Sequence, residues 1–312
     1  MAEAEFIARA VGDPGKTWDH DSVQGLASLQ VPDIVLGRQK LLLRADIHEQ
    51  WAKWFVESLG DPRQYADVSY PYIFEDVLTA IDRRFGGNYT RPQRFKLAST
   101  AARVIQGYVG VYVRRRRSQI SKKQRSFMID LAGSPPRCWI CGLRFSEVAI
   151  DNFVFQQRTE IPLPKFIDIL KPIGLKQRDL SIELDHVVAH ALGGEESDNL
   201  RIACGWCNRH KSSLVSIYDV EGRPRASLKR ELGFACLPHP FWTVRMLAVI
   251  RRCEHVDGCE RSAEADEMTV APVTESGAMN PTNLRVTCYE HDPIRLKRRQ
   301  SHRATSEIWG RA

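Results

Sequence analysis

The stretch Glu183-Leu-Asp185-His186-Val-Val-Ala-His190-Ala-Leu-Gly193-Gly194-Glu-Glu-Ser-Asp-Asn199-Leu200-Arg-Ile-Ala-Cys204-Gly-Trp-Cys207-Asn208-Arg-His210-Lys211 decides the fold of this chain. Its first part is a short apolar run that leads to a Gly-Gly turn, which predicts the first strand of a hairpin. Neighbouring residues of a strand point to opposite faces, so Asp185 and His186 cannot serve the same purpose. A carboxylate suits a hard cation such as Mg²⁺, whereas an imidazole suits a general base that takes a proton from water.

The same stretch ends in a Cys-x-x-Cys pair, Cys204 and Cys207, and a second such pair, Cys138 and Cys141, lies upstream. This spacing lets one metal ion bind both sulfurs of a tight turn. No secretory signal precedes them, so we expect a cytoplasmic, reducing location in which metal binding is favoured over disulfides. The four thiolates would complete a tetrahedral zinc site and leave no position for a substrate.

Taken together, Cys138-Trp-Ile-Cys141 and residues 183–211 resemble the HNH endonucleases, a family with a ββα-metal fold. The resemblance covers about residues 137–213. It implies that Asp185 and Asn208 bind a catalytic Mg²⁺ or Mn²⁺, that His186 activates water, that Asn199 orients the imidazole and that Lys211 meets the phosphate. Asn208 stands where many members have histidine, so His210 is an alternative ligand. A zinc-stabilised DNA-binding protein that has lost catalysis is the alternative interpretation of the whole motif.

The interval from Cys141 to Asp185 is longer than in compact members of that family. We interpret the insertion, residues 151–180, as a surface elaboration, with contact to the substrate as the alternative. Trp139 and Trp206, which flank the cysteines, are expected to pack around the zinc rather than to stack on bases.

A shift of 84 residues without a gap superimposes Asn199-Leu200-Arg201 on Asn283-Leu284-Arg285, and Cys204 on Cys288. This pattern predicts a degenerate second copy with its own zinc site, and chance similarity is the alternative. The expected ligands are Cys253, Cys259, Cys288 and His291, with His255 as a variant ligand, while Cys236 is left over as a buried thiol. The same shift places Thr269 and Val270 at the catalytic positions, so the copy is expected to be chemically inactive.

The chain before Gly133 has a different character. Residues 1–38 read as a loosely structured lead-in, and helical periodicity then predicts helices over 38–59, over 72–85 and from Pro92 onward. Residues 86–130 hold eleven Lys or Arg and one acid, which concentrates the net charge of +7 there. The basic residues expected to contact nucleic acid are Arg114, Arg115, Arg116, Arg117, Lys122, Lys123 and Arg125. A solvated helix end followed by a linker is the alternative.

These observations predict an α+β protein with three parts: a helical, basic recognition or assembly domain (1–132), an HNH nuclease domain (133–235) and a degenerate zinc-binding repeat with a basic tail (236–312). A further helix is expected near 241–252. No apolar stretch reaches membrane-spanning length. The expected activity is hydrolysis of phosphodiester bonds in DNA, in restriction or phage defence by resemblance, with a homodimer possible. A nuclease toxin and a homing nuclease of a mobile element are the alternatives within that chemistry.

Overall fold

The computed structural model describes the whole chain except residues 1, 13–19, 113–119, 188–199, 222–235 and 311–312. The protein is mixed α+β, about 53% helical with small sheets, which confirms the class predicted from the sequence. Within the described ranges, each of the three sheets is a two-stranded antiparallel pair, β1 with β6, β2 with β3 and β4 with β5. No helix in those ranges is both long and apolar enough to cross a membrane.

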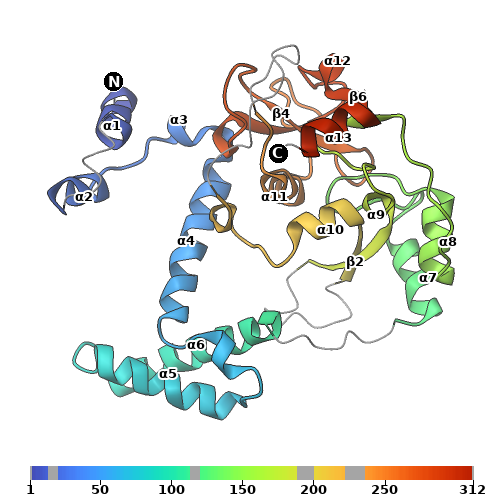
Figure 1. Cartoon of the computed structure of the whole chain (residues 1–312). Helices are drawn as coiled ribbons and strands as arrows, with labels where there is room; N and C mark the ends of the chain where they lie inside the picture. The colour runs from blue at the N-terminus through green and yellow to red at the C-terminus, as the bar shows by residue number, and fades with distance from the viewer. Residues whose placement is uncertain (1, 13–19, 113–119, 188–199, 222–235, 311–312) are drawn as a thin grey trace.

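The N-terminal half is an extended arrangement of helices that stands apart from the larger, mixed part of the molecule (Figure 1). The helices of this half are α1 (Ala2–Val11), α2 (His20–Ala27), α3 (Asp33–Leu36), α4 (Lys40–Glu57), α5 (Tyr70–Phe85) and α6 (Arg91–Tyr112), with 3-10 turns η2 (Gly37–Gln39) and η3 (Pro62–Tyr65). The next helix, α7 (Lys122–Leu131), lies against the larger part instead (Figure 1). The expectation of a loosely structured lead-in over 1–38 is therefore wrong for α1, α2 and α3. Their weak apolar pattern agrees with their exposure, since α2 buries none of its residues.

The three helices predicted from periodicity are confirmed as α4, α5 and α6, but α4 does not bury the face that the pattern indicates. Trp51 and Trp54 are 57% and 58% exposed, whereas Asp46 is fully buried. The Asp46 carboxylate accepts hydrogen bonds from the backbone N–H of Ile217 (2.6 Å) and from the guanidinium of Arg245 (2.7 Å). α4 therefore attaches to the larger part through a buried ion pair that hydrophobic periodicity cannot predict.

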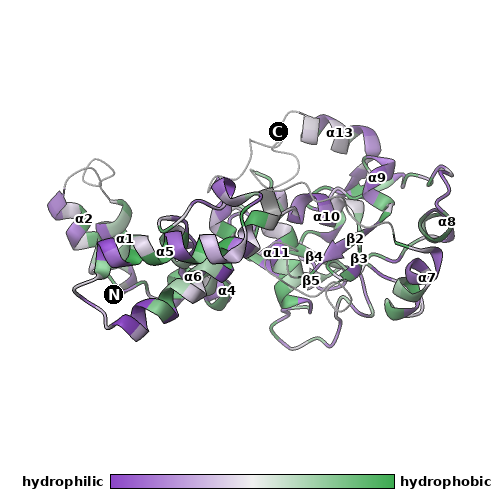
Figure 2. Cartoon of the chain, turned by 90° about the horizontal axis from the view of Figure 1, so that it is seen from below, coloured by the Kyte–Doolittle hydropathy of each residue, from purple (hydrophilic) through white to green (hydrophobic). Residues whose placement is uncertain are grey.

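Two hydrophobic cores follow from this layout. The smaller core joins η3, α5 and α6 around Ile73, Val77, Ile81 and Ile105. The larger core contains Leu42 and Leu43 of α4 together with apolar residues between 128 and 294. At its centre lies α11 (Pro240–Ile250), the helix expected near 241–252, whose apolar residues are green in Figure 2.

The remaining elements of the larger part are α8 (Glu147–Phe155), β1 (Phe166–Asp168), α9 (Gln177–Leu180), β2 (Ile182–His186), β3 (Leu200–Cys204), α10 (Gly205–Lys211), η5 (Ile217–Asp219), β4 (Met268–Pro272), η7 (Pro281–Asn283), β5 (Leu284–Cys288), α12 (Arg295–Arg298), β6 (Arg299–Ser301) and α13 (His302–Gly310).

The insertion over 151–180 is not a surface elaboration, so that interpretation is wrong. Its strand β1 pairs with β6 near the end of the described chain, with Ile167 opposite Gln300. Ile169 and Leu170, which follow β1, are fully buried in the larger core. The apolar run Phe166-Ile-Asp-Ile-Leu170 is the sequence signal for this burial.

Candidate metal centres and hydrolytic site

The first metal centre is formed by Cys138, Cys141, Cys204 and Cys207, whose sulfur atoms all lie within 4.8 Å of one another. The Sγ atoms of Cys141 and Cys204 are 4.0 Å apart. Four ligands at about 2.3 Å from a tetrahedral zinc ion would place their sulfurs roughly 3.8 Å apart. All four cysteines are buried. This cluster could therefore hold a structural metal ion such as zinc.

The electrostatics of this cluster favour a cation. Burial alone would raise the pKa of the Cys138 thiol, but hydrogen bonds from the three neighbouring thiols lower that pKa well below its ordinary value. Burial raises the pKa values of Cys204 and Cys207 well above the ordinary value. A second buried thiolate would be repelled by the charge of the first. A divalent cation that binds all four sulfurs offsets this repulsion.

Next to this centre, β2 and β3 form a hairpin with Ile182 opposite Cys204 and His186 opposite Leu200. β3 ends at Cys204, where α10 begins, and α10 carries Cys207, Asn208 and Lys211. Gly205 allows the close start of this helix, because a Cβ there would collide with the carbonyl oxygen of Arg178. The two cysteines of this segment thus fix where α10 lies on the hairpin.

The Asp185 carboxylate on β2 is buried, with only 4% of the residue exposed. Its Oδ2 accepts a hydrogen bond from the indole Nε1 of Trp139 (2.9 Å), and its Oδ1 accepts one from the ammonium Nζ of Lys211 (2.8 Å). Lys211 also donates to the backbone carbonyl of His186. Trp139 belongs to the first Cys-x-x-Cys turn, so the metal centre and Asp185 are joined by one hydrogen bond.

Glu183 lies two residues before Asp185 and therefore on the same face of β2. Its Oε2 accepts a hydrogen bond from the amide Nδ2 of Asn208 (2.7 Å), and its Oε1 accepts one from the guanidinium Nε of Arg178 (2.8 Å). With its NH₂ group directed at Glu183, the Asn208 amide keeps its Oδ1 for another contact. Two carboxylates and an amide oxygen on facing elements are hard donors of the kind that Mg²⁺ prefers. All four carboxylate oxygens here already accept hydrogen bonds, from Trp139, Lys211, Asn208 and Arg178.

Both tryptophans pack against the core that contains the four cysteines, as expected, but Trp139 has a second contact. Trp206 is buried (1% exposed), as expected, and its ring centre lies 4.8 Å from that of His210. Trp139 is only half-buried and donates to Asp185, so it belongs to the candidate hydrolytic site. The His210 ring, the alternative ligand, is thus placed against Trp206.

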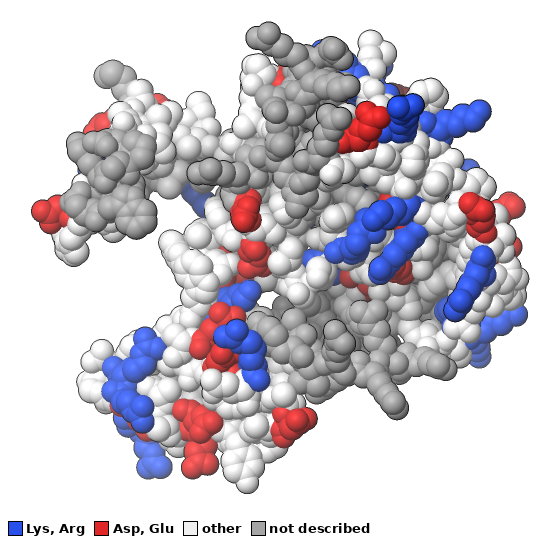
Figure 3. Space-filling model, in the orientation of Figure 1, with Lys and Arg blue, Asp and Glu red and all other residues white. Residues whose placement is uncertain are grey.

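Several predicted site residues lie outside the described residues, namely Asn199, His190, Gly193 and the run from Arg114 to Arg117. Of the other basic residues, Lys122 and Lys123 are exposed on α7, with the Lys122 ammonium 4.2 Å from the ring centre of Phe155. The Arg125 guanidinium donates to the backbone carbonyls of Val154 and Ile120. On the face drawn in Figure 3, the described Lys and Arg side chains form several separate groups, over the N-terminal helices and over the larger part.

The second predicted cluster is also assembled: the ligand atoms of Cys253, Cys259, Cys288 and His291 lie within 4.8 Å of one another. The Nδ1 of His291 is 3.4 Å from the Sγ of Cys288 and 3.7 Å from that of Cys253. Burial alone would raise the pKa of the Cys253 thiol, but hydrogen bonds from backbone N–H groups and from His291 lower that pKa to about 7. His255 stacks on His291 with ring centres 4.0 Å apart and is not part of the four-ligand set. The chain could therefore bind two structural metal ions such as zinc.

The two clusters share their backbone framework. Trp139 N–H donates to Ile202 C=O (3.1 Å) in the first, and Glu254 N–H donates to Val286 C=O (2.9 Å) in the second. Val286 follows Ile202 by the predicted 84 residues. The backbone hydrogen-bond pattern thus supports the duplicated unit inferred from the sequence.

The positions assigned to the degenerate catalytic pair require correction. Ile182 pairs with Cys204 in the first hairpin, and Met268 pairs with Cys288 in the second. The first strand is therefore offset by 86 residues rather than 84, because the second hairpin loop is shorter. By this register the counterparts of Asp185 and His186 are Ala271 and Pro272, not Thr269 and Val270, and Thr269 corresponds to Glu183.

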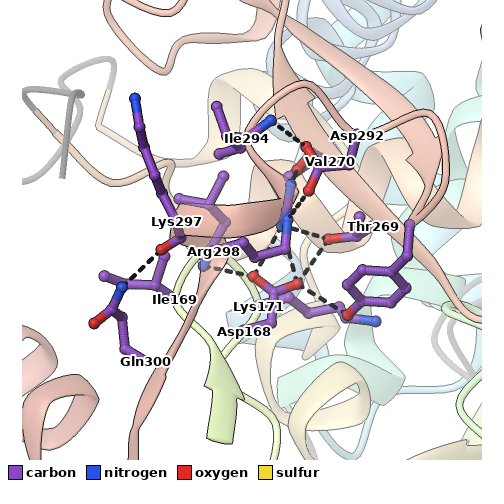
Figure 4. Close-up of polar contacts among 12 residues, drawn as sticks. Asp168, Ile169, Lys171, Thr269, Val270, Asp292, Ile294, Lys297, Arg298 and Gln300 are labelled. Carbon is purple, nitrogen blue, oxygen red and sulfur yellow. Dashed lines mark hydrogen bonds and ion pairs between the residues drawn. The ribbon is translucent and has the colours of Figure 1, made fainter.

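In the second unit the strand face that corresponds to Glu183 meets a buried charge network (Figure 4). The guanidinium of Arg298, which is fully buried, donates to the Asp168 carboxylate (2.8 Å), to Asp292 (2.5 Å) and to the hydroxyl of Thr269 (2.8 Å). The Thr269 hydroxyl in turn donates to Asp168 (2.8 Å). This face is therefore occupied by the Arg298 guanidinium, whereas in the first unit the cations Arg178 and Lys211 bond to Glu183 and Asp185.

Sequence reasoning missed Glu183, Trp139 and the Arg298 network. The signal for Glu183 was the two-residue period of the strand, which places it beside Asp185. No comparable signal exists for Arg298, whose partners lie up to 130 residues away.

No family model, curated protein or solved structure matches the chain. A function for this chain therefore has to be inferred from its own residues and their geometry.

Proposed function

We propose that this chain is a metal-dependent endonuclease of the HNH type that hydrolyses phosphodiester bonds in DNA. The observation that carries the proposal is the hairpin β2–β3 followed by α10, with Asp185 held between Trp139 and Lys211 and with His186 as the next residue on the opposite face of the strand. A hairpin and helix stabilised by a four-cysteine centre is the arrangement that the ββα-metal fold requires.

In this proposal Asp185 and Asn208 would hold a Mg²⁺ or Mn²⁺ ion, which would supply charge stabilisation for the phosphate and the leaving oxygen. His186 accepts a proton from water, and the water oxygen forms a bond to phosphorus while the bond to the leaving oxygen breaks. The leaving oxygen takes a proton from solvent. Glu183 holds Asn208 by its amide NH₂ group, and Arg178 holds Glu183. Lys211 orients the Asp185 carboxylate and supplies positive charge beside the phosphate.

One such centre can cut one strand per encounter, and the second unit offers Ala271 and Pro272 where acid and base are needed. We therefore expect a monomer to nick duplex DNA. Double-strand cleavage would require two chains with opposite strand polarity, most simply a two-fold dimer. A role in restriction or phage defence, with Arg114 to Arg117 as phosphate contacts, belongs to the same proposal.

The test is incubation of the purified chain with supercoiled plasmid, with Mg²⁺ or Mn²⁺ and with EDTA. We expect metal-dependent nicking, and His186→Ala should reduce its rate on the order of 10² to 10⁴-fold while DNA binding persists. Pro272→Ala changes the corresponding position of the second hairpin and is the matched control with unchanged rate. Full activity of His186→Ala would contradict the site assignment.

Binding without cleavage under all metal conditions would instead favour a zinc-stabilised DNA-binding protein. The same plasmid experiment therefore separates the two classes of function.

A further inference from the structure

A cavity of about 240 Å³ lies on the larger part of the molecule, between the insertion and the second unit. Its walls come from Phe145, Pro162, Pro164, Phe166, Tyr289 and Arg299, among others. None of Asp185, His186, Asn208 and Lys211 is among the residues that line it. This cavity is therefore distinct from the hydrolytic site.

Two arginines at this cavity form no ion pair with any described residue. Arg144 and Arg299 both line the cavity and both are exposed. Within the part of the chain that the structure describes, neither guanidinium forms a salt bridge or hydrogen bond, and Arg299 instead lies over the ring of Tyr289, 4.9 Å from its centre. Two such guanidinium groups beside a cavity are suited to a phosphate, which they bind with parallel hydrogen bonds.

Glu267 also lines the cavity and adds a hydrogen-bond acceptor to it. Glu267 Oε1 accepts a hydrogen bond from the Lys171 ammonium (2.7 Å) and lies 3.4 Å from the Tyr289 hydroxyl, which is also 3.2 Å from Asp168 Oδ2. Oε2 therefore has no hydrogen bond to the described residues, and the Glu267 side chain is 29% exposed. A partly accessible carboxylate oxygen of this kind pairs well with an exocyclic amino group.

The walls and the size restrict the ligand further. Phe166 is 59% exposed at the edge of the cavity, and aromatic and guanidinium surfaces are the ones on which nucleobases stack. Cavities that enclose drug-sized ligands measure about 300 to 1,000 Å³, so this smaller cavity suits a single base, with its sugar and phosphate outside it beside the exposed Arg144 and Arg299.

From these contacts we infer a binding site for one nucleotide unit whose base carries an amino group, with Arg144 and Arg299 on the phosphate and Glu267 on the amino group. Cytosine, adenine and guanine nucleotides fit this description, and thymine nucleotides do not. The site would hold one unstacked nucleotide of a strand, separate from the phosphate that is cut.

The test is isothermal titration of the full-length, metal-loaded protein with dCMP, dAMP, dGMP and dTMP, with deoxycytidine and inorganic phosphate as partial ligands. A mononucleotide has no phosphodiester bond to cleave, so the result is independent of the proposed nuclease activity. We expect binding at about millimolar affinity for at least one amino-bearing nucleotide, and weaker binding of dTMP, deoxycytidine and phosphate.

Arg144→Gln and Arg299→Gln should each weaken nucleotide binding about tenfold, as expected for one charge-assisted contact. Arg303→Gln, at an exposed position of α13 outside the cavity, is the matched control and should bind as the parent does. Glu267→Gln should abolish the preference over dTMP, with the melting temperature recorded because Lys171 loses its partner. Absence of binding at about 10 mM, binding of inorganic phosphate equal to that of the nucleotides, or no effect of either arginine substitution would overturn the inference.

Discussion

The hairpin β2–β3 and the hairpin β4–β5 begin from the same framework and differ in what lies against the first strand. Glu183 and Asp185 of β2 accept hydrogen bonds from Asn208 and Lys211 of α10. In the described chain no helix directly follows β5 as α10 follows β3, and Thr269 of β4 meets the buried Arg298. The difference teaches that the metal-ligand framework does not determine the strand face beside it: the framework is present in both units, while the charged residues on that face differ.

The largest expected effect concerns the metal centres. Cys204→Ser and Cys288→Ser each remove one ligand, and structural zinc supplies about 10 to 16 kcal/mol in small domains. We expect two ions per parent chain and one in each variant, by elemental analysis, with large losses of soluble protein. Cys236→Ser, at a cysteine outside both clusters, is the control and should retain both ions. One ion in the parent chain would contradict the duplicated unit.

A second expected effect tests the buried charge network of the second unit. Arg298→Met leaves Asp168 and Asp292 buried without their cation, and should lower the free energy of unfolding by about 3 to 5 kcal/mol in urea. Arg295→Met, at an exposed position of the same helix, should change it by no more than about 0.5 kcal/mol. Equal effects of the two substitutions would show that the network is not a stabilising feature.

A smaller effect should be visible in acid. Burial alone would raise the pKa of Asp168, but the charges of Arg298 and Lys171 lower it below its ordinary value. A lowered folded-state pKa stabilises the fold above the unfolded-state value, about pH 4, and this contribution disappears as the pH falls through the folded-state pKa.

The measurement is unfolding in urea between about pH 5 and pH 3. Asp168→Asn should lose stability less steeply on acidification than the parent, because it no longer takes up that proton on unfolding. Asp257→Asn, at an exposed side chain, should follow the parent. A parent-like slope in Asp168→Asn would contradict the assigned direction of the shift.

The smallest effect per residue concerns the basic run, which belongs to neither unit. If Arg114 to Arg117 contact phosphates, their replacement by Gln should weaken DNA binding regardless of sequence. The slope of log affinity against log salt should fall by about 0.9 for each phosphate that is no longer neutralised. Arg63→Gln is the control, because Arg63 lies in η3 and is paired with Asp61. An unchanged slope would favour the solvated helix end.

Local patterns predicted the parts of the molecule that local interactions determine. Helical periodicity located α4, α5, α6 and α11, cysteine spacing located the first metal cluster, and the 84-residue repeat located the second. Side-chain orientation along α4 was not predictable, because the ion pair between Asp46 and Arg245 joins residues 199 positions apart.

The sequence placed Asp185, Asn208 and Lys211 in one candidate site, but it indicated neither Glu183 nor the contacts among these residues. The Asp185–Lys211 pair and the position of Asn208 on α10 depend on how the helix lies on the hairpin, and no spacing rule indicates that Asn208 bonds to Glu183. The degenerate positions were displaced by two residues because an ungapped shift cannot detect a shorter hairpin loop. Strand register, not sequence offset, identifies Ala271 and Pro272.

The pairing of β1 with β6 also constrains how the chain can reach its native state. Asp168 and Arg298 are 130 residues apart, and Phe166 pairs with Ser301. Contacts of such high sequence separation form late, because a long loop must close before they contribute. During synthesis the insertion therefore cannot complete its packing when the β2–β3 hairpin has emerged. It must wait for the chain beyond residue 298, so the order of translation and the order of folding differ in this protein.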